Sequence, residues 1–155
     1  MTDSEATTLA VFALGGTVAV VMLVIAILMY VITCFGFAKM FKKAGEAGWK
    51  AFIPFYNTYI LYKRCWNTKM FFVWLALDIV SGVISGAAEN SVIFAILYLV
   101  VLVALIVIRA LSYGRISKAY GNGIGTAVGF FFLPTIFSWI VGLGKAQYTK
   151  PEDVL

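Results

Sequence analysis

The chain contains four long runs of apolar residues, and these limit its fold more than any other feature of the sequence. The runs cover residues 9–38, 70–88, 92–111 and 124–143. An α-helix needs about 20 such residues to cross the hydrocarbon core of a bilayer. Hydrophobic residues make up 63% of the chain and charged residues 12%, which is too much apolar surface for a soluble domain of this size to bury. We therefore predict an all-α integral membrane protein, a four-helix bundle in one domain over residues 1–155.

The positions of Lys and Arg predict the orientation of these helices. Ten of the 12 basic residues lie in two segments, 39–69 and 109–118, whereas the start of the chain and the 89–91 link have none. Basic links stay in the cytoplasm as a rule. We expect a multi-pass protein of the cytoplasmic membrane with both termini outside. The basic links would attract anionic lipid headgroups, and nucleic acid is a poor alternative partner for residues that the orientation already requires.

Few groups in the chain could carry catalysis. There is no histidine, which excludes the usual zinc, haem and Ser-His-Asp sites. Cys34 and Cys65 lie 31 residues apart, and we expect free thiols rather than a disulfide framework. The sequence thus predicts no enzyme activity, no metal and no cofactor.

The segment 48–62 is too short and too polar to cross a membrane. Its aromatic residues, among them Trp49 and Tyr56, recur at helical spacing beside lysines, and such side chains settle at the headgroup boundary. Pro54 suits the first turn of a helix. We predict an interfacial or re-entrant amphipathic element, which either anchors the bundle or lines a cytoplasmic vestibule with Tyr56, Asn57 and Thr58.

Three motifs resemble a family of small bacterial membrane proteins that are often labelled signal-peptidase-like. They are Gly48-Trp49 with Ile53-Pro54-Phe55-Tyr56-Asn57, then Ser117-Lys118-Ala119-Tyr120-Gly121, and Gly142 to Tyr148. The resemblance covers roughly residues 39–148 and implies a membrane bundle without a known reaction. The chain departs from the family in the second run, where Asp78, Ser81 and Ser85 stand in place of the usual Pro and Asn.

The signal-peptidase label does not fit the residues present. A Ser-Lys hydrolase needs a deprotonated lysine, which requires desolvation. No lysine lies within an apolar run, and the segments expected outside are short. Peptidase activity is therefore not expected.

Asp78 is the sharpest single feature, because it lies about 13 Å inside the second run at 1.5 Å per residue. Intramembrane carboxylates are costly and tend to be functional. Three interpretations remain open: a hydrogen-bonded packing residue, a site that handles protons or cations, and an ion pair. Arg109 is the expected partner for a pair, since an extended arginine and an aspartate could bridge the estimated separation.

Glycines and one proline suggest how the helices pack. Gly82 and Gly86 are four residues apart, as are Gly121, Gly125 and Gly129, and this spacing lets helices approach closely, either within the chain or in a homo-oligomer. Pro134 is expected to kink the last span.

Three classes of function are compatible with these features. The first is a small transport or channel-like protein with a polar path at Asp78. The second is a non-catalytic accessory, immunity or assembly protein that acts through helix–helix contacts. The third is an intramembrane or lipid-active enzyme, which needs a second polar group, such as Asn57, Tyr56 or Arg109, beside Asp78. A polar cavity that reaches Asp78 would favour the first.

Overall fold

The computed structural model describes residues 3–89 and 91–152, without the side chains of residues 3 and 6–11. This part of the chain is entirely helical, as the sequence predicts. The helices are, in order, α1 (Asp3–Lys43), η1 (Gly48–Phe52), α2 (Tyr56–Cys65), α3 (Thr68–Ala88), α4 (Val92–Ala119), α5 (Ile124–Phe132) and α6 (Pro134–Leu143).

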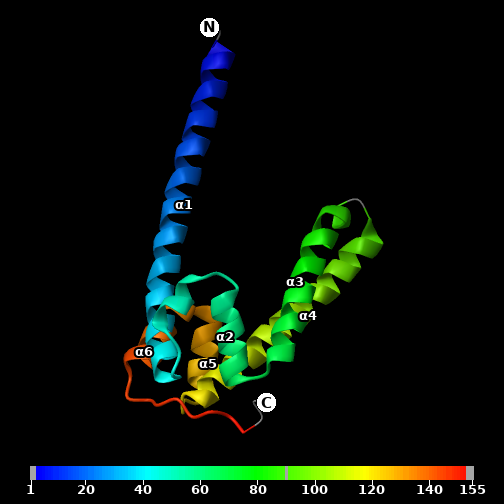
Figure 1. Cartoon of the computed structure of the whole chain (residues 1–155). Helices are drawn as coiled ribbons and strands as arrows, with labels where there is room; N and C mark the ends of the chain where they lie inside the picture. The colour runs from blue at the N-terminus through cyan, green and yellow to red at the C-terminus, as the bar shows by residue number, and fades with distance from the viewer. Residues whose placement is uncertain (1–2, 90, 153–155) are drawn as a thin grey trace.

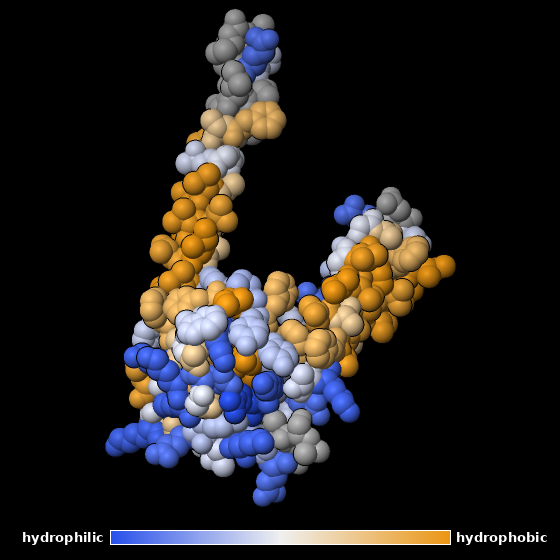
Figure 2. All heavy atoms as spheres, viewed as in Figure 1, coloured by the Kyte–Doolittle hydropathy of each residue, from blue (hydrophilic) through white to orange (hydrophobic). Residues whose placement is uncertain are grey.

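The molecule has a common base from which two arms rise (Figure 1). One arm is the N-terminal half of α1, and the other is the antiparallel hairpin of α3 and α4. The base contains α2, α5, α6 and the C-terminal ends of α1 and α4. Figure 2 shows that the arms are largely hydrophobic and that hydrophilic residues gather at the base. This division of polarity matches arms in hydrocarbon and a base at a membrane surface.

Within the described residues, three helices are long and apolar enough to cross a membrane: Phe12–Lys43, Thr68–Ala88 and Val92–Ala119. Every side chain from residue 12 to residue 30 is exposed. An apolar helix of this length with exposed side chains is unstable in water but stable in lipid, because its backbone groups are hydrogen-bonded within the helix. The chain is therefore a membrane protein.

The fourth apolar run, 124–143, is not one helix. It divides into α5 and α6 at Leu133, whose φ of −136° and ψ of 61° leave the helical region. Pro134 has no amide hydrogen and takes the first position of α6, where none is needed. The expected kink is therefore a complete break. Each piece is about 14 Å long, half of a bilayer core.

The two half-helices form a hairpin that starts and ends at the base. α5 runs back along α4, because Phe130 stacks on Tyr113 with ring centroids 5.9 Å apart. α6 then runs parallel to α1. Near its start Thr135 is 2.6 Å from the Thr33 hydroxyl, and near its end the Val141 carbonyl accepts from Lys43 at 2.7 Å.

This hairpin places the C-terminal segment at the base. The Tyr148 hydroxyl donates to the Arg64 carbonyl at 2.6 Å, and the Thr149 amide donates to the Ala119 carbonyl at 2.8 Å. The described start of α1 lies at the far end of the molecule (Figure 1). The described start of α1 and the C-terminal segment therefore lie at opposite ends of the molecule.

The base has its own packed core. Phe41, Met40, Ile60, Tyr120 and Phe130 are almost fully buried there, and both cysteines are free and buried. The Tyr120 hydroxyl donates to the Met40 carbonyl at 2.8 Å, which ties the end of α4 to the end of α1. This core holds the helices that surround the candidate site.

Candidate functional site

Two adjoining cavities lie between the base and the α3–α4 hairpin. The cavity nearer the base has a volume of about 270 Å³ and is lined by residues of α1, α2, α3, α4 and α6. The second has about 360 Å³ and extends between α3, α4 and α5 toward Asp78. They share the residues Trp74, Arg109, Tyr113 and Pro134. The structure therefore brings Asp78 and Arg109 to the wall of the same cavity, the second one.

Helical spacing explains why these side chains share the cavity. Trp74 and Asp78 are four residues apart on α3, and Arg109 and Tyr113 are four apart on α4, so each pair lies on one face of its helix. Because α3 and α4 form an antiparallel hairpin, residues equally far from the turn lie side by side. Leu102 lies about opposite Asp78, because both are about 12 residues from the turn, and it lines the same cavity.

Most polar groups that line the cavity nearer the base have hydrogen-bond partners within the protein. The Asn57 amide donates to the Ala51 carbonyl at 3.2 Å and accepts from the Thr58 hydroxyl at 3.0 Å. The Ser112 hydroxyl donates to the Arg109 carbonyl at 2.8 Å. These groups form a polar lining whose orientation is fixed within the protein.

Asp78 and Arg109 differ from this lining. The ion pairs between described residues are those of Glu46 with Lys50 and Arg64. The expected direct pair of Asp78 with Arg109 is not among them, and the described part of the chain gives neither charged group a hydrogen-bond partner. Two opposite charges therefore face the same cavity without contact.

The segment expected to be one amphipathic element is two short helices. η1 ends at Phe52 and α2 begins at Tyr56, so Pro54 precedes α2 and is not in its first turn. Between them Phe55 has φ 61° and ψ −41°, and the Tyr56 amide donates to the Pro54 carbonyl at 2.6 Å. This is a γ-turn, a strained conformation that redirects the chain. Asn57 and Thr58 lie in the cavity wall, whereas Tyr56, which the vestibule interpretation also included, does not.

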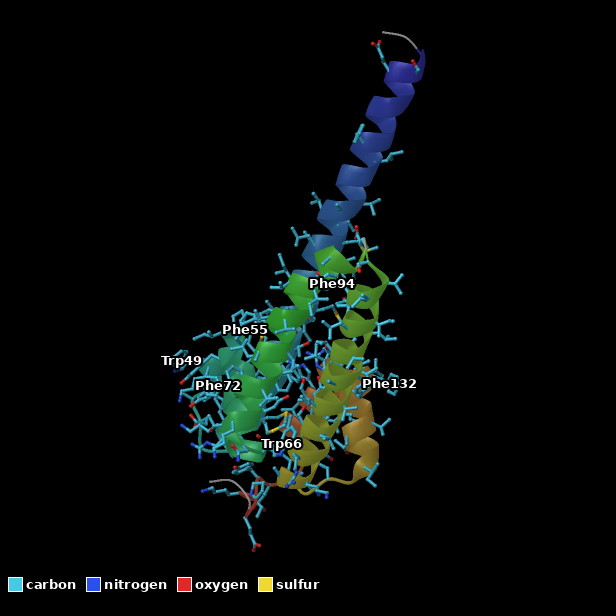
Figure 3. The ribbon with its side chains drawn as sticks, turned by 90° about the vertical axis from the view of Figure 1, so that its right-hand side faces the viewer. Trp49, Phe55, Trp66, Phe72, Phe94 and Phe132 are labelled. Atoms are coloured by element: carbon cyan, nitrogen blue, oxygen red, sulfur yellow. The ribbon has the colours of Figure 1, made fainter. Side chains whose placement is uncertain are left out.

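Aromatic side chains of the base and of the adjoining start of α3 lie on the outer surface. Trp49, Phe55 and Phe72 follow one side of the molecule and Phe132 the other (Figure 3). Each is more than half exposed in the isolated chain. Tyr56 is also exposed, and its ring stacks on Tyr59 with centroids 5.8 Å apart. Rings in such positions suit the headgroup boundary.

The glycines expected at helix contacts are mostly in open space. A Cβ built at Gly82, Gly86, Gly121 or Gly125 would meet nothing within 4 Å, although Gly121 has a φ of +68° that favours glycine. Gly129 is the exception, since a Cβ there would lie 2.1 Å from the Phe137 ring. Of the five glycines, only Gly129 packs closely against another helix of the described chain.

A second close helix contact involves residues that the sequence analysis did not single out. Gly36 of α1 faces Ser138 and Gly142 of α6, and a Cβ at Gly142 would lie 2.9 Å from the Gly36 carbonyl oxygen. The Trp139 indole also donates to the Ile32 carbonyl at 2.9 Å. Ser138 and Gly142 are four residues apart, the same small-residue spacing as Gly82 and Gly86. This spacing was the signal that could have identified them.

Lys43 is a second residue whose role the sequence did not indicate. Its ammonium group donates to the carbonyls of Val141 and Gly144 at 2.7 Å and of Ala146 at 2.9 Å. The last carbonyls of a helix have no partner within it. A lysine from α1 thus caps the C-terminal end of α6.

Comparison with known proteins gives one match. Residues 49–151 match the family of unknown function DUF5684. No curated protein and no solved structure matches the chain. The match covers all but the first residue of η1, then α2, α3, α4, the half-helix hairpin and most of the tail. It therefore includes every lining residue of the two cavities except Thr33 and Phe37 of α1. The chain is a membrane protein that belongs to the DUF5684 family.

Proposed function

We propose that this protein is a small transport or channel-like protein of the cell membrane, with a polar path past Asp78 and Arg109. The observation that carries the proposal is the pair of adjoining cavities between the base and Asp78. Asp78 lies about 15 Å from either end of α3, hence near the middle of a bilayer core of about 30 Å. Polar groups at that depth are expensive and are kept for function.

The half-helix hairpin supports the proposal. Helix ends at membrane depth are tolerated where they line a cavity, and broken helices form the binding sites of many transporters. Here α6 begins at Pro134, which lines both cavities. On the Pro134 side the break thus lies at the wall of the cavities that Arg109 also lines, although Leu133 itself is exposed.

The proposed topology has three full spans and a hairpin that enters from the cytoplasmic side. In this arrangement all 12 Lys and Arg residues lie on the cytoplasmic side or, like Arg109, in the cytoplasmic half of a span. The two tail lysines were exceptions under the four-span prediction. The basic base would contact anionic headgroups, and the N-terminus would lie outside. The proposal includes no catalytic activity.

Purified protein in liposomes tests the transport function. Light scattering after an osmotic step would report entry of small neutral, anionic, cationic and zwitterionic solutes. We expect at least one solute to enter several-fold faster than into empty liposomes. Asp78→Asn and Arg109→Gln should slow its entry. Ser85→Ala, a polar change on α3 outside the cavity lining, should leave the rate unchanged. Rates equal to those of empty liposomes for every solute, with intact helical circular dichroism, would contradict the proposal.

A second candidate is an accessory or assembly protein that acts through helix contacts. It is favoured by the exposed face of α3 at Gly82 and Gly86 and by the bare helix from residue 12 to residue 30. Small residues at this spacing accept another helix in a membrane. Leucine at Gly82 or Gly86 should then disrupt a homo-oligomer or complex without changing the thermal stability of the monomer. Unchanged assembly in native nanodiscs would contradict this candidate.

A further inference from the structure

We infer that the cavity between Asp78 and Arg109 binds a small zwitterion, a molecule with a carboxylate at one end and an ammonium group at the other. The inference rests on the proposed function, because it names the class of solute for the same path. Its starting point is the pair of opposite charges that line one cavity of about 360 Å³ without pairing.

The charges of the cavity determine which ligand can neutralise it. An anion bound at Arg109 would leave the Asp78 carboxylate in a medium of low dielectric constant. A cation bound at Asp78 would leave the Arg109 guanidinium, nearer the base, without a partner. Uncompensated charges at this depth are costly. A ligand with both charges satisfies both side chains and adds no net charge to the membrane interior.

The positions of the two groups suit such a ligand. Arg109 is seven residues beyond Leu102, the residue level with Asp78, so their helix positions differ by about 10 Å along the hairpin. Because the two residues lie at different levels of the hairpin and form no ion pair, we expect a ligand whose charges are separated by several methylene groups rather than by one.

The other lining residues have complementary chemistry. Arginine binds a carboxylate with two parallel hydrogen bonds, and the Tyr113 hydroxyl lies one turn beyond it on α4. The Trp74 ring lies one turn from Asp78, and an indole face attracts ammonium groups. Leu105, Ile106 and Phe131 form an apolar wall for the methylene segment.

A chain-length series tests the inference on the full-length protein in detergent. The probes are glycine, β-alanine, 4-aminobutyrate, 5-aminopentanoate and 6-aminohexanoate, with butyrate and butylammonium as single-charge controls. Binding is measured from the shift in melting temperature and from tryptophan fluorescence. We expect affinity to peak at an intermediate length. Both single-charge controls should bind at least about tenfold more weakly than the best zwitterion, the equivalent of one lost ionic contact.

Variants assign the two ends of the ligand. Asp78→Asn should bring 4-aminobutyrate down to the affinity of butyrate, whereas Arg109→Gln should abolish butyrate binding. Ser85→Ala should behave as the parent does. The length series on the parent protein remains decisive if a variant does not fold.

Two results would overturn the inference. One is equal binding of butyrate and 4-aminobutyrate by the parent protein, which would indicate an anion site with a proton on Asp78. The other is no response to any member of the series. These results are separable from a failure of the proposed function. Zwitterion binding without flux in liposomes would contradict transport alone, and flux without zwitterion binding would contradict this inference alone.

Discussion

Gly36 of α1 lies so close to Ser138 of α6 that a methyl group on residue 36 would come within 2.2 Å of the Ser138 hydroxyl oxygen. Ser138 is fully buried, and its hydroxyl donates to the Thr135 carbonyl at 2.8 Å. In the described part of the chain α6 packs mainly against α1, so this contact fixes the half-helix hairpin to the base.

The first prediction concerns this contact. Gly36→Ala should destabilise the protein by about 1–3 kcal/mol, because the added methyl group overpacks a filled contact. Thermal unfolding in detergent, followed by circular dichroism, measures the change. Gly16→Ala is the matched control, since Gly16 lies on the same helix in open space. Equal melting temperatures for the two variants would contradict the packing of α6 on α1.

The second prediction concerns the Lys43 cap. Lys43→Met keeps the aliphatic stem but removes three hydrogen bonds to the end of α6. We expect the free energy of unfolding to fall by about 1–3 kcal/mol. Hydrogen bonds from a charged donor are stronger than neutral ones, but the freed carbonyls regain hydrogen bonds to water, which limits the loss. Lys42→Met changes an exposed neighbour in the same way. A larger loss for Lys42→Met than for Lys43→Met would rule out the cap.

The third prediction concerns the pH dependence of stability. Hydrogen bonds from Lys50 and from Arg64 lower the pKa of Glu46 below its ordinary value of 4.5. A carboxyl group whose pKa is lowered by folding contributes stability above its unfolded pKa and loses it as pH falls through the folded one. The melting temperature should therefore fall as the pH drops below about 4.5.

A substitution isolates the contribution of Glu46. Glu46→Gln should lower the melting temperature at neutral pH and flatten its dependence on acid pH. Glu89→Gln, an exposed carboxylate at the far end of the hairpin, serves as the control. An acid transition of the same size in Glu46→Gln and in the parent would assign the effect to other groups.

The fourth prediction concerns the side of the membrane on which the tail lies. Single cysteines at Lys42, Glu89 and Gln147, in a background with Cys34→Ala and Cys65→Ala, are treated in intact cells with an impermeant thiol reagent. We expect reaction at residue 89 and protection at residues 42 and 147. All three should react after the cells are broken. Reaction at residue 147 in intact cells would show that 124–143 crosses the membrane completely.

The sequence determined the elements whose formation depends on local composition. The apolar runs that became the cores of α1, α3 and α4 were identified because their length and hydropathy decide on their own that they enter a membrane. Their polar breaks were found for the same reason, since the 39–69 segment and the 89–91 link are charged or polar. Asp78 was recognised as unusual because the cost of a carboxylate in hydrocarbon does not depend on the fold.

Only the tertiary structure decided how the fourth apolar run is used. Residues 124–143 have the same hydropathy whether they form one span or two half-helices. Pro134 permits both a kink and a break. The outcome depends on contacts with residues about 100 positions away, such as Thr135 with Thr33 and Trp139 with Ile32.

The tertiary structure also decided which glycines lie at helix contacts and which residues surround Asp78. Gly82 and Gly86 have the spacing of a helix contact, but the face of α3 that meets other helices is set by the hairpin, and the close contact formed at Gly36 and Gly142 instead. A sequence specifies which residues lie on one helix face. Which face becomes buried, and which charges meet in one cavity, depends on the arrangement of helices that are distant in the chain.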